Sequence, residues 1–151
     1  MTQKCLYAFI ALSLAAMTAC SGTMQGVVRK DARRVSFNYS DSRIGTADVN
    51  VALPEGERFA GRVQRGTKNT AIDSGTTSNT ESFEAVEAFN GNADAVLSGN
   101  RGNIMKCRFN LTDIIIGFSS GGFGICQVSD GRVIDIFFRK KGGQAKQMLL
   151  K

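Results

Sequence analysis

Residues 49–63 read VNVALPEGERFAGRV, in which two stretches of alternating apolar and polar residues flank the turn-forming loop Pro54-Glu55-Gly56. Such alternation is typical of strands with one buried face. A three-residue loop brings the apolar residues of both strands to one face, whereas a two-residue loop of Glu55-Gly56 turns Phe59 to the polar face. We therefore expect the three-residue hairpin. Its opposed pairs are Val51 with Phe59, Val49 with Gly61 and Ala47 with Val63.

Residues 126–138, CQVSDGRVIDIFF, predict a second hairpin of the same kind. The loop Ser129-Asp130-Gly131 also ends in glycine, which can adopt the left-handed conformation and form a bulge there. This register places small residues opposite large ones on the inner face. The opposed pairs are Cys126 with Ile134, Gly124 with Ile136 and Gly122 with Phe138.

A disulfide between Cys107 and Cys126 is expected from the same pairing logic. Opposing the two cysteines also sets other small and large residues against one another, while residues 106, 108 and 110 point to the other face. The alternative is two separate buried thiols, which requires that the two strands are not neighbours. The further pairs in this register are Phe109 with Gly124, Leu111 with Gly122 and Met105 with Val128.

The rest of the chain fits an all-β fold, a small antiparallel barrel or sandwich of about eight strands. Residues 66–82 are polar and turn-rich, so we expect a long flexible loop. Residues 81–90, ESFEAVEAFN, are compatible with a strand but favour one short helix. The expected strands are 24–30, 35–40, 46–53, 57–65, 93–99, 103–111, 122–129 and 132–139.

The first twenty residues have the order of a secretory signal: one cation, Lys4, then an uncharged apolar stretch from Cys5 to Met17, then small residues. The stretch is too short to remain as a membrane span, which needs about 20 apolar residues. Met17-Thr18-Ala19-Cys20 resembles the bacterial lipobox. That resemblance implies a helical signal peptide over 1–19, cleavage before Cys20 and a lipid on the Cys20 thiol. An ordinary cleaved signal is the alternative.

The lipobox resemblance also implies a location. Ser21 follows the cysteine where an aspartate would resemble an inner-membrane retention signal, so we expect a lipid-anchored protein of the outer membrane that faces the periplasm. The mature chain would then have a tether over 20–23, one β-domain over 24–139 and a basic tail over 140–151. The segment from Gly99 to Phe138 resembles small envelope lipoproteins, a likeness that implies no activity.

The formal net charge of +6 at pH 7 is unevenly distributed along the chain. Lys4 lies in the leader and five cations lie in the last thirteen residues, so the body between them has no net charge. Such a tail is usually solvated, and it could also attract anionic glycans or lipopolysaccharide phosphates. Nucleic acid is not expected as a partner in this compartment.

No catalytic arrangement is evident in the sequence. Histidine is absent, which removes Ser-His and Cys-His nucleophile systems and argues against a metal site. The pairs Glu84 with Glu87 and Asp130 with Asp135 are the candidate glycosidase carboxylates. They are better explained as surface and turn residues, and the glycines of 121–124 as small partners in the core. We expect no cofactor, no metal and no enzyme.

The connection 112–121, TDIIIGFSSG, is unusually apolar for a loop. Its apolar residues could contact a partner, could fold back to plug the end of a barrel, or could extend the preceding strand through Ile114. The candidate contact residues are Ile114, Ile115, Ile116 and Phe118.

These observations favour a non-catalytic, lipid-anchored envelope protein that binds another envelope component. Inhibition of a lysozyme or protease is a second hypothesis, because small disulfide-bonded β-domains on lipid anchors resemble periplasmic lysozyme inhibitors. The neutral body offers no acidic run to bind a cationic lysozyme, which argues against it. A carboxylate-dependent hydrolase of cell-wall glycans is a third hypothesis, and it requires two carboxyl groups that converge in a cleft.

Overall fold

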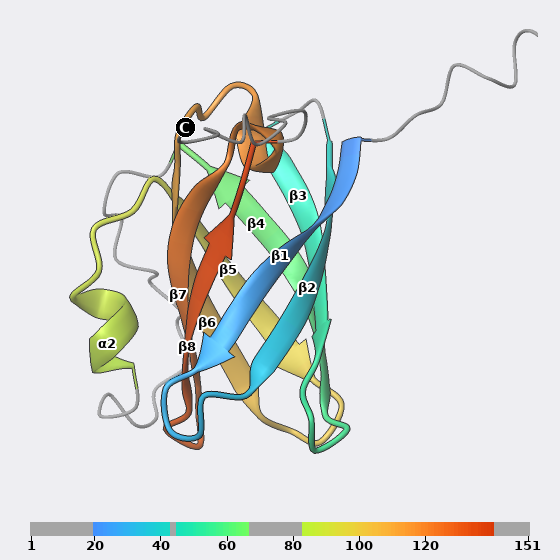
Figure 1. Cartoon of the computed structure of the whole chain (residues 1–151), viewed down its shortest axis with the longest axis vertical. Coiled ribbons are helices and arrows are strands. Elements are labelled where there is room, and N and C mark those ends of the chain that lie inside the picture. The colour runs from blue at the N-terminus through green and yellow to red at the C-terminus, as the bar shows by residue number, and fades with distance from the viewer. Residues whose placement is uncertain (1–19, 43–44, 67–82, 141–151) are drawn as a thin grey trace, which may run out of the picture.

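The computed structural model describes residues 20–42, 45–66 and 83–140. They form a closed barrel in which each of eight strands pairs antiparallel with the next and β8 returns to β1 (Figure 1). The all-β prediction is therefore confirmed, and of its two forms the barrel is the one found. The strands are β1 (Cys20–Val28), β2 (Arg34–Asp41), β3 (Thr46–Ala52), β4 (Arg58–Arg65), β5 (Ala93–Gly99), β6 (Ile104–Leu111), β7 (Gly122–Val128) and β8 (Val133–Phe138).

The predicted registers are confirmed in all three strand pairs. β3 and β4 place Val51 opposite Phe59, and β7 and β8 place Gly124 opposite Ile136. β6 and β7 place Cys107 opposite Cys126, and the two cysteines form the disulfide with Cα atoms 4.0 Å apart. The turn residues and the two-residue period of a strand were enough to predict these registers, because the loops of the two hairpins are only three residues long.

Of the four turns that join β1 to β2, β3 to β4, β5 to β6 and β7 to β8, three end in a glycine with positive φ. Gly56 and Gly131 have φ of 86° and 92°, as the sequence led us to expect, and Gly102 between β5 and β6 has φ of 89°. The turn between β1 and β2 uses Ala32 at φ 57° instead. All four turns lie at one end of the barrel, which we call the turn end (Figure 1).

The barrel interior is filled by side chains from all eight strands. Small residues give the room that the large ones need: a Cβ atom on Gly124 would lie 2.6 Å from a ring carbon of Phe109, and one on Gly61 would collide with the Val96 carbonyl oxygen. The buried residues therefore form a packed core that fixes which strands face one another. The largest fully buried side chains include Phe37, Phe59, Phe109 and Phe118.

β1 begins earlier than the sequence predicted. The expected tether over 20–23 is wrong, because these residues pair with β2 and Cys20 itself lies opposite Asp41. Their side chains carry no apolar alternation, so only the backbone ladder reveals the strand. β1 ends at Val28, before the turn that was counted in its predicted range.

The opposite end of the barrel, which we call the loop end, carries the longer connections and both ends of the described barrel (Figure 1). The short predicted helix is confirmed as α2 (Glu84–Glu87), which packs on the outside of β6 and β7. Arg108 holds it there by donating hydrogen bonds to the carbonyls of Glu87 and Phe89. Within the described ranges no helix is long and apolar enough to cross a bilayer. The predicted leader, the basic tail from residue 141 and most of loop 66–82 lie outside the described residues.

Candidate functional site

Phe118 closes the loop end of the barrel from inside. It belongs to the 3-10 helix η2 (Gly117–Ser120) and is fully buried. Its ring centroid lies 5.2 Å from Tyr39, 5.1 Å from Phe109 and 5.4 Å from Phe138. The prediction that Phe118 contacts a partner is therefore wrong, and its role as a plug is confirmed. Extension of the preceding strand through Ile114 is also wrong, since β6 ends at Leu111.

The three isoleucines of the same loop point outward. Ile114, Ile115 and Ile116 are 40%, 92% and 53% exposed, and we call them the isoleucine cluster. An isoleucine side chain left fully in water, as Ile115 nearly is, forgoes about 1.5–3 kcal/mol that burial would contribute. One loop thus has a plug on its inner side and an unburied apolar cluster on its outer side, and contact of that cluster with a partner stays a prediction.

Hydrogen bonds within the loop hold the isoleucine cluster in one conformation. The carboxylate Oδ1 of Asp113 accepts from the backbone N–H groups of Ile115 and Ile116, at 2.8 and 3.1 Å. Ser120 Oγ accepts from the Asp113 N–H at 3.0 Å and donates to the Gly117 carbonyl at 2.6 Å. The cluster is therefore a built feature of the loop, in which the N–H groups of Ile115 and Ile116 both have an acceptor.

Asp41 and Arg65 fasten the loop to the ends of β2 and β4. Asp41 Oδ2 accepts from the Phe118 N–H at 3.0 Å, and Arg65 donates to the carbonyls of Ile114 and Ile115 at 3.3 and 3.4 Å. A second Arg65 nitrogen donates to the Ser42 carbonyl at 2.7 Å. Burial raises the pKa of Asp41, although attraction to Arg65 and the N–H donors oppose it. We call the pair of Asp41 and Arg65 the clamp.

Gly117 is required where the loop meets the clamp. Its φ is +79°, in the left-handed region, and a Cβ atom there would collide with the guanidinium of Arg65 and the carboxylate of Asp41. Only a residue without a side chain fits both conditions. No sequence pattern pointed to the clamp, because Asp41 and Phe118 are 77 residues apart.

Cys20 lies beside this arrangement. It is exposed, and its ladder partner is Asp41, the residue that binds the plug. The predicted lipid attachment residue and the predicted contact loop therefore lie at the same end of the barrel (Figure 1). No chain separates Cys20 from the folded domain, since it is the first residue of β1.

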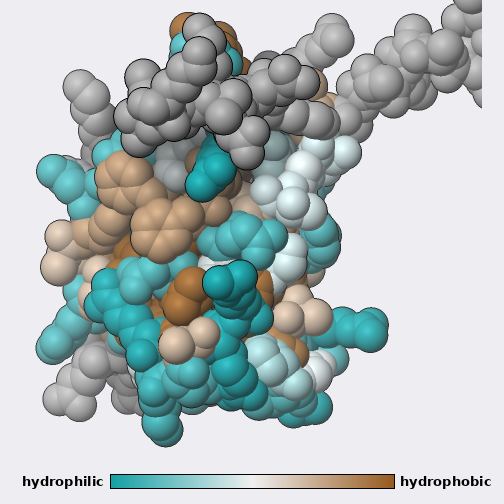
Figure 2. Space-filling model, viewed as in Figure 1, coloured by the Kyte–Doolittle hydropathy of each residue, from teal (hydrophilic) through white to brown (hydrophobic). Residues whose placement is uncertain are grey.

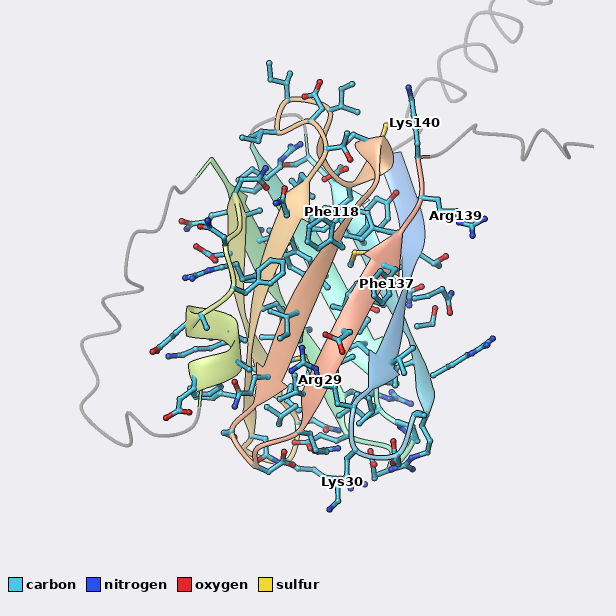
Figure 3. The ribbon with its side chains drawn as sticks, turned by 60° about the vertical axis from the view of Figure 1, so that its left-hand side comes forward. Arg29, Lys30, Phe118, Phe137, Arg139 and Lys140 are labelled. Carbon is cyan, nitrogen blue, oxygen red and sulfur yellow. A yellow bond between two sulfur atoms is a disulfide. The ribbon has the colours of Figure 1, made fainter. Side chains whose placement is uncertain are left out.

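An aromatic and basic rim continues the apolar surface along the outer wall. Phe123 and Phe137 are cross-strand partners and are 47% and 60% exposed, and the Phe89 ring packs edge-on against Phe123. Apolar surface appears there in the space-filling view (Figure 2). Arg139 and Lys140 follow β8 at the loop end and are exposed (Figure 3).

The turn end has the opposite character. Arg132 binds Glu55 at 3.0 Å, Glu57 at 3.3 Å and Asp130 at 2.6 Å, and Arg33 binds Glu55 and Asp31. Burial acts to raise the pKa of Asp130, but hydrogen bonds and attraction from Arg132 outweigh it and leave that pKa lowered. The two ends of the barrel thus differ in chemistry: the turn end has arginine–carboxylate pairs and further exposed cations such as Lys30 and Arg101, whereas the loop end has the exposed isoleucines with Arg139 and Lys140 nearby.

The remaining candidate residues do not form a common site. Glu84 and Glu87 are exposed on α2, whereas Asp130 binds Arg132 and Asp135 binds Arg29. Within the described part of the chain no group of three or more histidine, cysteine or acidic residues could hold a metal ion. The Cys107–Cys126 disulfide is fully buried and joins β6 to β7.

A shallow groove of about 690 Å³ lies on the outer wall of β2 to β5. Small and uncharged polar side chains make up most of its lining, including Asn38, Asn50, Ala60 and Ser98. Asn38 and Asn50 are already hydrogen-bonded to each other at 3.2 Å. The groove therefore offers little chemistry with which to select a ligand.

The candidate site is the loop end, comprising the isoleucine cluster, the clamp beneath it, the aromatic and basic rim, and Cys20. Comparison of the chain with protein-family models, with curated proteins and with solved structures finds no match to any of them.

Proposed function

We propose that the protein is a non-catalytic, lipid-anchored module of the bacterial outer membrane, facing the periplasm, that binds another envelope component through the loop end of its barrel. The lipid would be carried by Cys20. The observation that supports the proposal best is the isoleucine cluster, in which Ile115 is 92% exposed on a loop that the hydrogen bonds described above hold in place. An ordered, exposed apolar surface is the usual mark of a contact site.

Inhibition of a lysozyme or protease is a weaker second proposal. A cationic lysozyme would need an unbalanced acidic surface, and the carboxylates at the turn end are each bound by an arginine. Glycan hydrolysis through Glu84, Glu87, Asp130 and Asp135 has less support, because the ion pairs of Asp130 and Asp135 involve different arginines.

The proposal is tested with the mature chain carrying Cys20→Ser, which lacks the lipid and changes only the first residue of β1. We would measure its co-sedimentation with envelope fragments of the bacterium that produces it, and compare the double variant Ile115→Ser/Ile116→Ser. Loss of two apolar contacts should weaken binding about tenfold or more.

Ile104→Ser is the matched control, because Ile104 is 45% exposed but starts β6 at the turn end. Its binding should equal that of the parent, and circular dichroism should be the same for all three proteins. Equal binding by the double variant and the parent would show that the loop is not the contact site. Mass spectrometry of the mature N-terminal peptide tests the attachment separately, and an unmodified Cys20 would disprove it.

A further inference from the structure

We infer that the component bound by the loop end is the lipid bilayer itself, so that the barrel stands on the membrane with the isoleucine cluster inserted at the interface. This inference rests on the lipid attachment proposed above. It goes further by naming the partner of the exposed isoleucines and the orientation of the domain.

The first support is the absence of a linker between Cys20 and the barrel. A lipidated protein with a long tether can hold its domain away from the membrane in any orientation. Here Cys20 already belongs to the β1–β2 ladder, opposite Asp41. A lipid on that residue places the edge of the barrel at the membrane surface, and the end that carries Cys20 must face it.

The second support is that Asp41 links Cys20 to the apolar loop. Asp41 is the ladder partner of Cys20 and also accepts the hydrogen bond from Phe118, two residues after the isoleucine cluster. Arg65 fixes the carbonyls of Ile114 and Ile115 from the neighbouring side. The membrane that receives the lipid is therefore the nearest apolar phase to the isoleucines.

The third support is the composition of the rim. Interfacial segments of proteins combine apolar and aromatic side chains with cations that meet lipid phosphates. Phe137 is exposed on the outer wall of β8, and Arg139 and Lys140 follow it toward the loop end (Figure 3). At the turn end the acidic residues are bound by arginines, and Lys30 is exposed there too (Figure 3), so the isoleucine cluster and not charge alone distinguishes the loop end.

The test uses the lipidated full-length mature protein in vesicles of phosphatidylcholine and phosphatidylglycerol whose acyl chains are brominated. The chain has no tryptophan, so Ile115→Trp introduces a single reporter that bromine quenches on contact. Ile104→Trp is the matched reporter at the turn end. Interfacial side chains enter roughly 5–10 Å below the headgroups, so the emission at position 115 should fall about twofold or more while that at 104 is unchanged.

Two outcomes would overturn the inference, and they differ from failure of the proposed attachment. If the acyl groups are found by mass spectrometry but both reporters are unquenched, the barrel is tethered without docking. If the reporter at 115 is shielded from both brominated lipid and aqueous acrylamide, another part of the protein covers the isoleucines. If no acyl group is found on Cys20, the attachment itself is wrong and the inference falls with it.

Discussion

The carboxylate of Asp41 accepts a hydrogen bond from the backbone N–H of Phe118 at 3.0 Å, between residues 77 positions apart in the sequence. This bond joins the end of β2 to the loop that closes the barrel. Because Cys20 pairs with Asp41, the same residue also links the proposed lipid attachment site to the plug. Asp41 therefore contributes both to closure of the barrel and to the placement of the loop that carries the isoleucine cluster.

Replacing Asp41 with alanine should lower the free energy of unfolding by about 1–3 kcal/mol, because the Phe118 N–H loses its acceptor at a partly buried position and Arg65 loses the attraction of a nearby carboxylate. Urea denaturation would measure the change. Asp48→Ala is the control, since the ion pair of Asp48 with Arg62 is about two-thirds exposed on both sides and should contribute no more than about 0.5 kcal/mol. Equal losses in the two variants would contradict the role of the clamp.

The pH dependence of stability should change in the Asp41→Asn variant. Burial raises the pKa of Asp41 in the folded protein, so the native state holds this proton more tightly than the unfolded chain does. The contribution of Asp41 to the free energy of unfolding therefore falls as the pH rises from about 4 through the folded pKa.

The amide that Asp41→Asn introduces cannot titrate, so the stability of the variant relative to the parent should rise with pH over this interval and then level off. Urea midpoints measured between acid and neutral pH would show it. A difference between the two proteins that stays constant with pH would contradict the direction of the shift. The other carboxylates are common to both proteins and cancel in the comparison.

Phe118→Ala should lower the free energy of unfolding by about 3–5 kcal/mol, because it removes a fully buried ring that touches three other aromatic rings. Phe137→Ala is the comparison, since Phe137 is 60% exposed on the outer wall and should cost well under half as much. Thermal melting of the two variants would rank them. A loss for Phe118→Ala no greater than for Phe137→Ala would mean that the plug does not close the core.

Removal of the disulfide by Cys107→Ala/Cys126→Ala should lower stability by about 3 kcal/mol, since the bridged cysteines are 19 residues apart and unfolding would gain the freedom of that loop. The reduced parent keeps both sulfur atoms, so comparing it with the double variant separates loop closure from packing. Denaturation curves of the oxidised parent and the reduced parent that coincide would show that the bridge adds nothing.

The parts of the fold that could be predicted from the sequence are those set by short-range rules. The registers of Val51 with Phe59 and of Cys126 with Ile134 follow from a three-residue turn and a period of two, and both are correct. Closure into a barrel depends on pairing of β1 with β8, which joins the two ends of the domain. No local sequence pattern indicates that contact, so the sequence alone could not distinguish a barrel from a sandwich.

The candidate site was predicted only in part for the same reason. The apolar composition of 112–121 identified an unusual loop, but the direction of each side chain was set by Asp41 and Arg65, which contact it from 49 to 77 residues away. Residues 20–23 were assigned to a tether because they have no apolar alternation. Their pairing with β2 is a property of the backbone that composition does not encode.

The continuous ladder from Cys20 has a consequence for reach. β1 has nine residues and rises about 3.3 Å per residue, so the turn that follows it begins roughly 30 Å along the strand from Cys20. On the proposed attachment, a molecule that meets Arg132 and Glu55 must itself come this close to the lipid. The length of the barrel would then set how far from the membrane the protein can bind a partner, because no linker between Cys20 and β1 could extend that distance.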